Sequence, residues 1–462
     1  MSDSRMLAHR RLAELCRMVR DGEVGAEALV DGALERIDAV NPAINAVVQL
    51  ARERALERAR EADRARSRGE VWGPLHGIPM TVKDSLDTAG IISTAGTAGR
   101  RNFVPERDAT VVERLRRAGA ILLGKTNTAE LTLSYQTNNV IYGRTSNPYD
   151  PSRTSGGSSG GSAAIVASGA IPFDIGSDTG GSLRIPAHYC GVVALKPTEG
   201  RVPRTGHVIS FGGHLSRLTA LGPIARFVDD LSILLPIMAG PDGRDPTIAP
   251  VPIGRPQDVD LGALRIALHI DNGVASPSAQ TVDVLRRAAN ALRPLVGCLV
   301  EDVGLPRAMD AQRLFSELYA ADGGAWRRRL LLAATTITKK EAEKGVKRGL
   351  APAEFSALLE HWDGFRSEAL SFFDSYDAVL CPVTAGPAPA HGAGEVSAFS
   401  YTQYFSLTGW PCAVIRGGWE GALPIGIQIA APPWREDIAL RIAAHLEAEL
   451  GGWTMPARLT AS

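Results

Sequence analysis

The stretch RTSGGSSGGSAAIVA occupies residues 153–167, and the stretch GSDTGGSLRIP follows at residues 176–186. In the first stretch a glycine-rich loop runs directly into small apolar residues that favour a helix. Glycine permits backbone conformations in which main-chain amides point at an anion, and a helix start adds positive potential. A flexible linker is the alternative, but linkers rarely lead into a helix-forming apolar stretch. The two stretches therefore predict two turns that place serine hydroxyls beside amide donors.

The segments around these turns predict an α/β fold. Residues 1–70 are predicted to be helical, with apolar residues at helical spacing from Ala26 to Val40 and a helix end at Asn41-Pro42. Beyond them, short apolar runs such as residues 78–82 and 121–123 predict buried strands that alternate with helical patterns. This alternation is typical of one large α/β domain with a mixed or parallel sheet.

Composition excludes several classes of protein. The 462 residues include 50 Lys plus Arg and 50 Asp plus Glu, so the net charge of zero gives no indication of a nucleic-acid partner. Hydrophobic residues at 45% and charged residues at 22% are typical of a globular chain. Five scattered cysteines suggest neither disulfides nor a zinc site, which favours the cytoplasm. We expect no membrane association, because no apolar stretch of about 18 residues occurs.

Two further patterns suggest cofactors that we do not expect. Residues 119–126, GAILLGKT, match the Walker A pattern letter for letter. The residues between its glycines form a predicted strand that follows a helix, whereas a phosphate-binding loop follows a strand. The group EHWD at residues 360–363 is an isolated and weak metal pattern. The sequence therefore predicts an enzyme without a metal or cofactor.

Ser182 lies in the second turn and is a candidate nucleophile, which needs a proton acceptor within hydrogen-bond reach. The nine histidines show no partnering pattern, and His188, the nearest, suits a structural or pocket role equally well. The G-x-S-x-G elbow of α/β hydrolases is absent, because Arg184 stands two residues after Ser182. Lys83 is another candidate base, since burial lowers the pKa of a lysine. An ion pair with Asp84 explains Lys83 equally well, so the residues alone leave the base open.

The two stretches together resemble the amidase signature family. Its hallmarks are a Gly-Gly-Ser-Ser-Gly-Gly-Ser loop and a Gly-x-Asp-x-Gly-Gly-Ser-x-Arg-x-Pro segment, and both are complete here. The resemblance implies one large α/β domain whose central mixed β-sheet is covered by helices on both faces. Further matching segments are HGIP at 76–79, VKD at 82–84, LGKTN at 123–127, YGRT at 142–145, CGVV at 190–193, LKPT at 195–198, LTGWP at 407–411 and LPIGIQ at 423–428.

The resemblance also implies a catalytic triad, in which Ser182 is the nucleophile and Lys83 is the base. Ser158 bridges them and follows a cis peptide bond from Gly157. Neutral Lys83 takes the Ser182 proton through Ser158, Ser182 attacks the amide carbonyl, and water later releases the acyl group. The other implied roles are the oxyanion hole, formed by the backbone amides of Thr179, Gly180, Gly181 and Ser182, and support of the loops by Asp178, Arg184, Ser159 and Ser162.

The resemblance divides the predicted single domain, residues 1–462, into four regions. Residues 1–70 form the helical N-terminal region and residues 71–240 hold the catalytic core. Residues 245–378, where the resemblance is weakest, are a variable region that shapes the substrate pocket. Residues 379–462 return to the core. A homodimer is implied at the level of the family only.

Two branches of the family remain open, together with a non-catalytic binding protein that the complete triad disfavours. Free-standing amidases hydrolyse small amides, whereas the glutamine-hydrolysing subunit of a tRNA-dependent amidotransferase works with partner chains. In the amidotransferase branch, an acidic residue holds the glutamine amino group ten positions before the glycine that is Gly409 here, and this position is Phe399. We therefore expect a small-molecule amide with an aryl or apolar acyl group. The predicted pocket contains Phe399, Tyr404 and Trp410, although such aromatics suit helix packing equally well.

Overall fold

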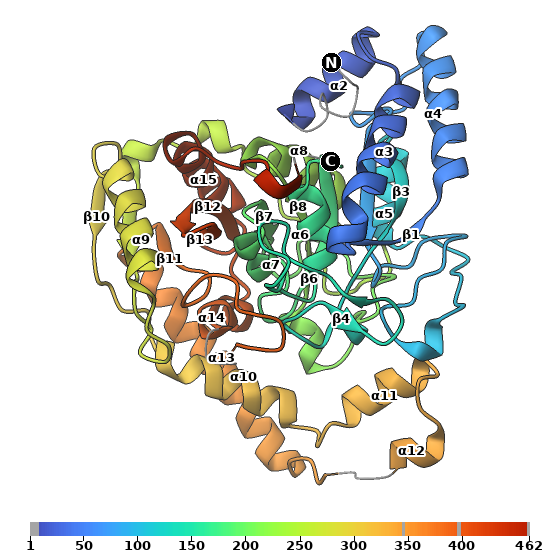
Figure 1. Ribbon diagram of the computed structural model, residues 1–462. Helices are drawn as coiled ribbons and strands as arrows, with labels where there is room; N and C mark the ends of the chain where they lie inside the picture. The colour runs from blue at the N-terminus through green and yellow to red at the C-terminus, as the bar shows by residue number, and fades with distance from the viewer. Residues whose placement is uncertain (1–8, 344–346, 395–398, 460–462) are drawn as a thin grey trace.

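The computed structural model describes residues 9–343, 347–394 and 399–459 (Figure 1). Within them, eleven strands form one sheet in the order β1-β3-β2-β6-β8-β7-β12-β13-β11-β9-β10, and β4 pairs with β5 separately. The strands are β1 Val47–Leu50, β2 Pro79–Lys83, β3 Ile121–Thr126, β4 Asn138–Asn139, β5 Gly143–Arg144, β6 Phe173–Asp178, β7 Val193–Lys196, β8 Ala220–Ala225, β9 Arg265–Leu268, β10 Cys298–Val300, β11 Ala378–Pro382, β12 Cys412–Glu420 and β13 Leu423–Ala430.

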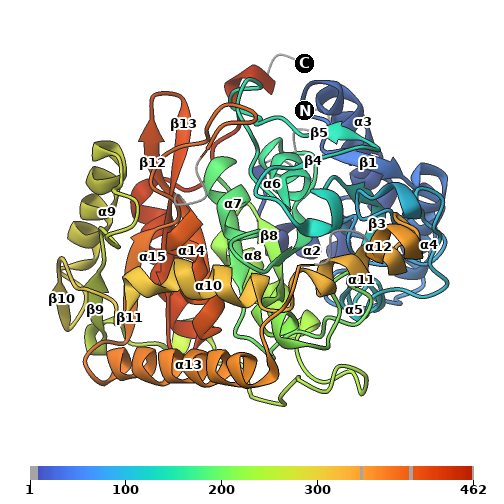
Figure 2. The same ribbon diagram turned by 90° about the horizontal axis from the view of Figure 1, so that it is seen from below.

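Helices pack on the sheet and alternate with its strands, which confirms the predicted α/β fold (Figures 1 and 2). None of the described helices is long and apolar enough to cross a membrane. The helices are α2 Leu12–Asp21, α3 Ala26–Ile44, α4 Arg52–Ser67, α5 Thr110–Arg117, α6 Gly160–Ala167, α7 Arg184–Tyr189, α8 Val228–Met238, α9 Ala279–Leu292, α10 Ala311–Ala320, α11 Ala325–Ala333, α12 Lys339–Glu343, α13 Pro352–Leu370, α14 Ser400–Thr408 and α15 Glu436–Leu450.

The sheet is mixed, and its parallel part brings the two glycine-rich stretches together. β2 pairs in parallel with both β3 and β6, whereas β6 and β8 are antiparallel. Because adjacent parallel strands end at the same edge of a sheet, Lys83 at the end of β2 lies beside the last residues of β6. Every residue of α6 is buried, and this helix packs on β6 and β8. The loop that precedes α6 lies at the same edge, because its Ser158 contacts Lys83.

Two elements near the N-terminus differ from the prediction. The region 1–70 also contains β1, a four-residue strand that pairs antiparallel with β3 at the margin of the sheet. Its pairing depends on a partner far along the chain, which no local pattern reveals. α3 continues past Pro42 to Ile44, because the left-handed residue Asn45 closes the helix by donating its N–H to Asn41 O (2.7 Å).

The Walker-like segment forms the strand that the sequence predicts. All six residues of β3 are buried, and they include Gly124 and Lys125. Lys125 donates hydrogen bonds to the Leu86 carbonyl and to Thr88 Oγ1, the latter at 2.7 Å. This lysine therefore supports the loop after β2 and does not belong to a phosphate-binding loop.

Candidate active site

Lys83 ends β2, and its side chain is fully buried. Its Nζ atom lies 2.6 Å from Ser158 Oγ and 2.9 Å from both Ser159 Oγ and Ser177 Oγ. The carboxylate of Asp84 accepts its hydrogen bonds from a neighbouring threonine instead. Three serine hydroxyls, and not the adjacent aspartate, are the hydrogen-bond partners of this lysine.

The surroundings of Lys83 favour its neutral form. Burial lowers the pKa of Lys83 to about 7, because the charged amine is deprived of water, and the charges of Asp178 and Asp174 oppose this only in part. A neutral amine has two N–H groups and one lone pair, so one serine hydroxyl then donates to Nζ. Lys83 can therefore accept a proton from a serine near neutral pH.

The first glycine-rich turn presents Ser158 to this lysine. The peptide bond between Gly157 and Ser158 is cis, as the family resemblance implied. Gly157 lies against the backbone of Gln136, so that an added Cβ would lie 2.6 Å from its nitrogen atom. The next residue, Ser159, donates its N–H to the carbonyl of Ser182 (3.3 Å). This bond connects the first turn to the second.

Ser182 lies in the second turn, between β6 and α7, and borders a cavity. The residue is 6% exposed. Within the described residues its Oγ atom makes no hydrogen bond. The structure thus contains the contact between Lys83 and Ser158 but no hydrogen bond between the hydroxyls of Ser158 and Ser182.

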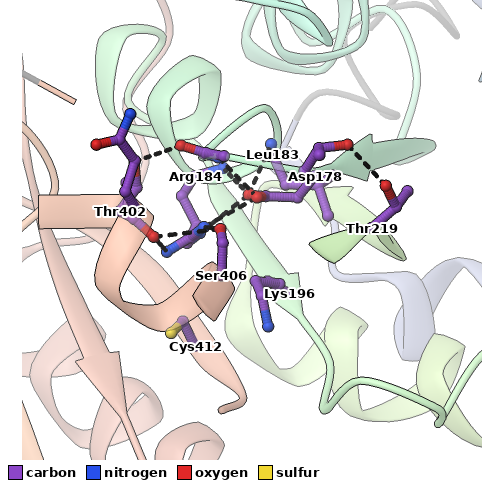
Figure 3. Close-up of polar contacts among 12 residues, drawn as sticks. Asp178, Leu183, Arg184, Lys196, Thr219, Thr402, Ser406 and Cys412 are labelled. Atoms are coloured by element: carbon purple, nitrogen blue, oxygen red, sulfur yellow. Dashed lines mark hydrogen bonds and ion pairs between the residues drawn. The ribbon is translucent and has the colours of Figure 1, made fainter. Parts of the chain in front are cut away.

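A buried ion pair supports the second turn (Figure 3). Arg184 Nε and Nη2 lie 2.9 Å from Asp178 Oδ2 and Oδ1, and neither side chain is exposed. The carboxylate also accepts the N–H groups of Gly181 (2.7 Å) and Leu183 (3.1 Å). Burial alone raises the pKa of Asp178, but the Arg184 charge and these hydrogen bonds lower it to about 2. The carboxylate therefore stays charged and fixes the backbone that carries Ser182.

The four amides expected to form the oxyanion hole are not equivalent. The Gly181 N–H already donates to Asp178, so this amide is occupied. The N–H groups of Thr179, Gly180 and Ser182 have no acceptor within the described part of the chain. Three of the four expected amides are therefore available to a ligand.

The cavity beside Ser182 has a volume of about 370 Å³, which suits a small molecule. Three aromatic side chains, Tyr135, Phe315 and Tyr319, contribute to its wall, together with Gln403. Phe315 and Tyr319 lie on α10, which packs against α14 (Figure 2). No charged side chain lines the cavity among the residues that the structure describes.

The aromatic residues predicted to form the pocket lie elsewhere, so that prediction needs correction. Phe399 lies behind the wall, with its ring stacked on Tyr135 at a centroid distance of 3.6 Å. Tyr404 and Trp410 belong to the hydrophobic core and contact each other at 5.8 Å between ring centroids. α14 is buried all round, and the residue of this helix that borders the cavity is Gln403. Helix packing is therefore the correct explanation of these aromatics.

Two other residues singled out from the sequence have supporting contacts. The Ser162 hydroxyl pairs with Thr126 Oγ1 (2.9 Å) and not with Lys83. A ring nitrogen of His188 lies 3.0 Å from the carbonyl of Gly386, and burial lowers the pKa of His188 to about 4. Both side chains hold the structure around the site.

Sequence reasoning missed Ser177, Tyr135, Gln403 and the pair on α10. Ser177 directly precedes Asp178 in a motif already singled out, so the motif itself was an available signal. Phe315 and Tyr319 are four residues apart in the region expected to shape the pocket, which places them on one helix face. Tyr135 and Gln403 left no such signal, because they meet only in the folded chain.

Comparison with known proteins identifies the family of this chain. The Amidase family pattern matches residues 28–440. The chain is 34% identical to a glutamyl-tRNA(Gln) amidotransferase subunit of Geobacillus kaustophilus, covering 94% of this chain and 96% of that one. It is 33% identical to an indoleacetamide hydrolase of Bradyrhizobium diazoefficiens, covering 94% and 85%. The structure of 6-aminohexanoate cyclic dimer hydrolase with substrate superposes with a TM-score of 0.86 at 28% identity, covering 97% and 99%. The chain therefore belongs to the amidase family and is a hydrolase of amide carbon–nitrogen bonds.

Proposed function

We propose that this enzyme hydrolyses small carboxylic amides through an acyl-enzyme on Ser182, with Ser158 and Lys83 as the proton relay. The observation that carries the proposal is the buried amine of Lys83, 2.6 Å from Ser158 Oγ. Its pKa of about 7 gives a substantial neutral fraction at neutral pH. A neutral amine is the form that a general base requires.

The first half of the reaction acylates the enzyme. Ser182 Oγ attacks the amide carbonyl carbon while its proton passes to Ser158 Oγ, and the Ser158 proton passes to Lys83 Nζ. The carbon–nitrogen bond then breaks as the relay returns a proton to the nitrogen, which leaves as ammonia or an amine. Because the two hydroxyls are not hydrogen-bonded in the structure, the Ser182 hydroxyl has to turn toward Ser158 for this step. Catalytic hydrogen bonds often form only when the substrate binds.

The second half releases the acid. Water attacks the ester on Ser182 and gives its proton to the same relay, and the carboxylic acid leaves as Ser182 regains its hydrogen. The free amides of Thr179, Gly180 and Ser182 are the proposed donors to the oxyanion in both halves. Each such donor contributes about 10²–10³-fold in rate. The remaining loop residues, Asp178 and Arg184, act by holding these amides.

The cavity favours a neutral acyl group. Its described wall contains three aromatic rings and no charged side chain. An ionised group placed there loses water without gaining a counter-charge, which is costly. An aryl or apolar acyl group instead gains by burial, at roughly 25 cal/mol per Å². We therefore propose amides of aryl carboxylic acids as the preferred substrates.

The glutamine-hydrolysing subunit of a tRNA-dependent amidotransferase is the second candidate function. It is favoured by the 34% identity to the amidotransferase chain of Geobacillus kaustophilus. The uncharged cavity argues against it, because glutamine carries both an ammonium and a carboxylate group. Phe399, which stacks on Tyr135, also offers no carboxylate to the ammonium. We therefore place this candidate second.

Ammonia release by the purified chain tests the proposal. The panel contains aliphatic, aryl and peptidyl amides and glutamine, and the Ser182→Ala variant is the control. We expect turnover of aryl amides by the wild type and none by the variant. Turnover of glutamine alone would contradict the proposal and support the amidotransferase function. Aryl amide turnover that persists in Ser182→Ala would refute the acyl-enzyme.

We propose the cytoplasm as the location of the enzyme. Its five cysteines are free thiols in the structure, and Cys190, Cys381 and Cys412 are buried. Free thiols persist in a reducing compartment. Fractionation of the native host, followed by immunodetection, tests this location.

A further inference from the structure

Gln403 belongs to the cavity wall and carries a buried acceptor that has no partner among the described residues. This residue lies on α14, lines the cavity and is 1% exposed. Its Nε2 donates to Tyr135 Oη at 3.1 Å. Within the described residues, its Oε1 atom has no hydrogen-bond partner. Buried polar atoms are almost always paired, because leaving one unpaired is energetically costly. A ligand that donates a hydrogen bond would remove this cost.

The amide of Gln403 is held close to the reacting centre. The ring of Tyr135 is stacked on Phe399 with an interplanar angle of 15°, which fixes the phenol that anchors Gln403. A Cβ atom built on Gly180 would lie 3.2 Å from Tyr135 Oη and 2.9 Å from Phe315 Cζ. The Gln403–Tyr135 pair therefore lies beside the turn that carries Ser182. Gln403, Tyr135 and Ser182 thus line one cavity.

A second residue of the same wall also carries an unpaired polar atom. Thr132 borders the cavity and is 7% exposed, and its Oγ1 atom has no partner within the described residues. Thr132 and the preceding Leu131 both have left-handed backbones, with φ of 63° and 48°. Such conformations are unfavourable for residues other than glycine, and they cluster at ligand-binding sites. The wall thus combines apolar rings with two residues whose buried polar atoms have no partner among the described residues.

We propose that Gln403 is a specificity-determining residue that accepts a hydrogen bond from an N–H or O–H group on the aryl acyl part of the substrate. This inference rests on the proposed function and narrows its substrate class to planar aromatic acyl groups that carry one ring donor, such as a phenol or an indole. The rings of Phe315 and Tyr319, stacked at 24° with centroids 5.6 Å apart, supply the apolar surface for the ring.

Paired amides with and without the donor test the proposal. We compare kcat/KM for 4-hydroxyphenylacetamide with that for 4-methoxyphenylacetamide. We also compare kcat/KM for indole-3-acetamide with that for the derivative methylated on the indole nitrogen. A hydrogen bond of ordinary strength gives the wild type about a tenfold preference for the donor in each pair. In Gln403→Met, which keeps the volume but loses the acceptor, we expect the two members of each pair to react equally.

Ser316→Ala is the matched control for the donor preference. Ser316 lines the same cavity, but its hydroxyl already donates to Gln312 O (2.8 Å), so the preference should persist. Tyr135→Phe removes the anchor of the Gln403 amide and should lower the preference without abolishing it. If Gln403→Met does not fold, the lowered donor preference of Tyr135→Phe still tests the proposal.

Three results would overturn the role of Gln403. They are equal reactivity of both members of each pair with the wild type, a preference for the methylated members, and a donor preference that survives in Gln403→Met. A wild type that hydrolyses none of these amides would contradict the proposed function instead. Calorimetric binding of the same pairs to Ser182→Ala then decides the role of Gln403 separately: tighter binding of the donor member supports it, and equal or no binding refutes it.

Discussion

Two regions meet at Ser182, and they differ in how far their polar groups are paired. On one side, Lys83, Ser158, Asp178 and Arg184 form a buried cluster in which each of these side chains is hydrogen-bonded. On the other side, the cavity wall is mainly aromatic and retains unpaired atoms on Thr132 and Gln403 among the described residues. The cluster's side chains are thus paired within the protein, whereas we propose that a substrate pairs with the wall. In the proposed function, the cluster supplies the chemistry and the wall selects the substrate.

Loss of Ser182 should have the largest effect. Ser182→Ala leaves no atom to carry the acyl group, and we expect kcat to fall by at least about 10⁴-fold. Adding Lys83→Met to this variant should cost little more, because residues of one relay do not contribute additively. Single-turnover kinetics with an aryl amide measure both. A double variant that is far slower than Ser182→Ala would show that Lys83 acts independently of the nucleophile.

Loss of the base Lys83 should have the second-largest effect on activity. Lys83→Met should lower kcat/KM by about 10²–10⁴-fold, the usual contribution of a general base. Because burial lowers the pKa of Lys83 to about 7, the wild type should gain activity as the pH rises through 7 and Lys83 becomes neutral. A pH profile of kcat/KM should show this rise in the wild type and lose it in the variant. An unchanged rise in Lys83→Met would assign the titration to another group.

The ion pair behind the turn should affect stability. Asp178→Asn leaves Arg184 buried without its counter-charge, and the free energy of unfolding should fall by about 3–5 kcal/mol. The folded pKa of Asp178 is lowered to about 2. Its contribution to stability is therefore complete above the unfolded value of about 4 and is lost as the pH falls towards 2. Urea unfolding between pH 2 and 7 measures both effects, and equal stabilities at pH 7 would contradict them.

The smallest effect should come from Tyr404, a core residue that the sequence placed in the pocket. Its hydroxyl is buried without a hydrogen-bond partner in the described structure. Tyr404→Phe removes that unpaired group, so stability should stay equal or rise by roughly 1 kcal/mol. The ratio of kcat/KM between any two aryl amides should not change. A changed ratio of kcat/KM in this variant would show that Tyr404 belongs to the substrate pocket.

The same contrast explains how much of the site could be predicted from the sequence. The cluster residues lie within short motifs, and adjacent parallel strands bring Lys83 and Asp178 to one edge of the sheet. The wall combines residues near 135, on α10 and on α14, and its composition depends on how those helices pack. Residues 399–410 are rich in aromatics in the sequence. Which face of α14 meets the cavity, however, is decided by tertiary contacts. Gln403 and not Tyr404 therefore borders the cavity beside Ser182.

The most direct test of the account is the detection of the acyl group on Ser182. An aryl amide or its ester is mixed with the enzyme, the reaction is quenched in acid, and the tryptic peptide of residues 154–184 is fragmented in a mass spectrometer. This peptide contains both Ser158 and Ser182, so the fragments distinguish the two serines. The account predicts one acyl group on Ser182 in the wild type and none in Ser182→Ala. An acyl group on Ser158, or full turnover without any acylated Ser182, would contradict it.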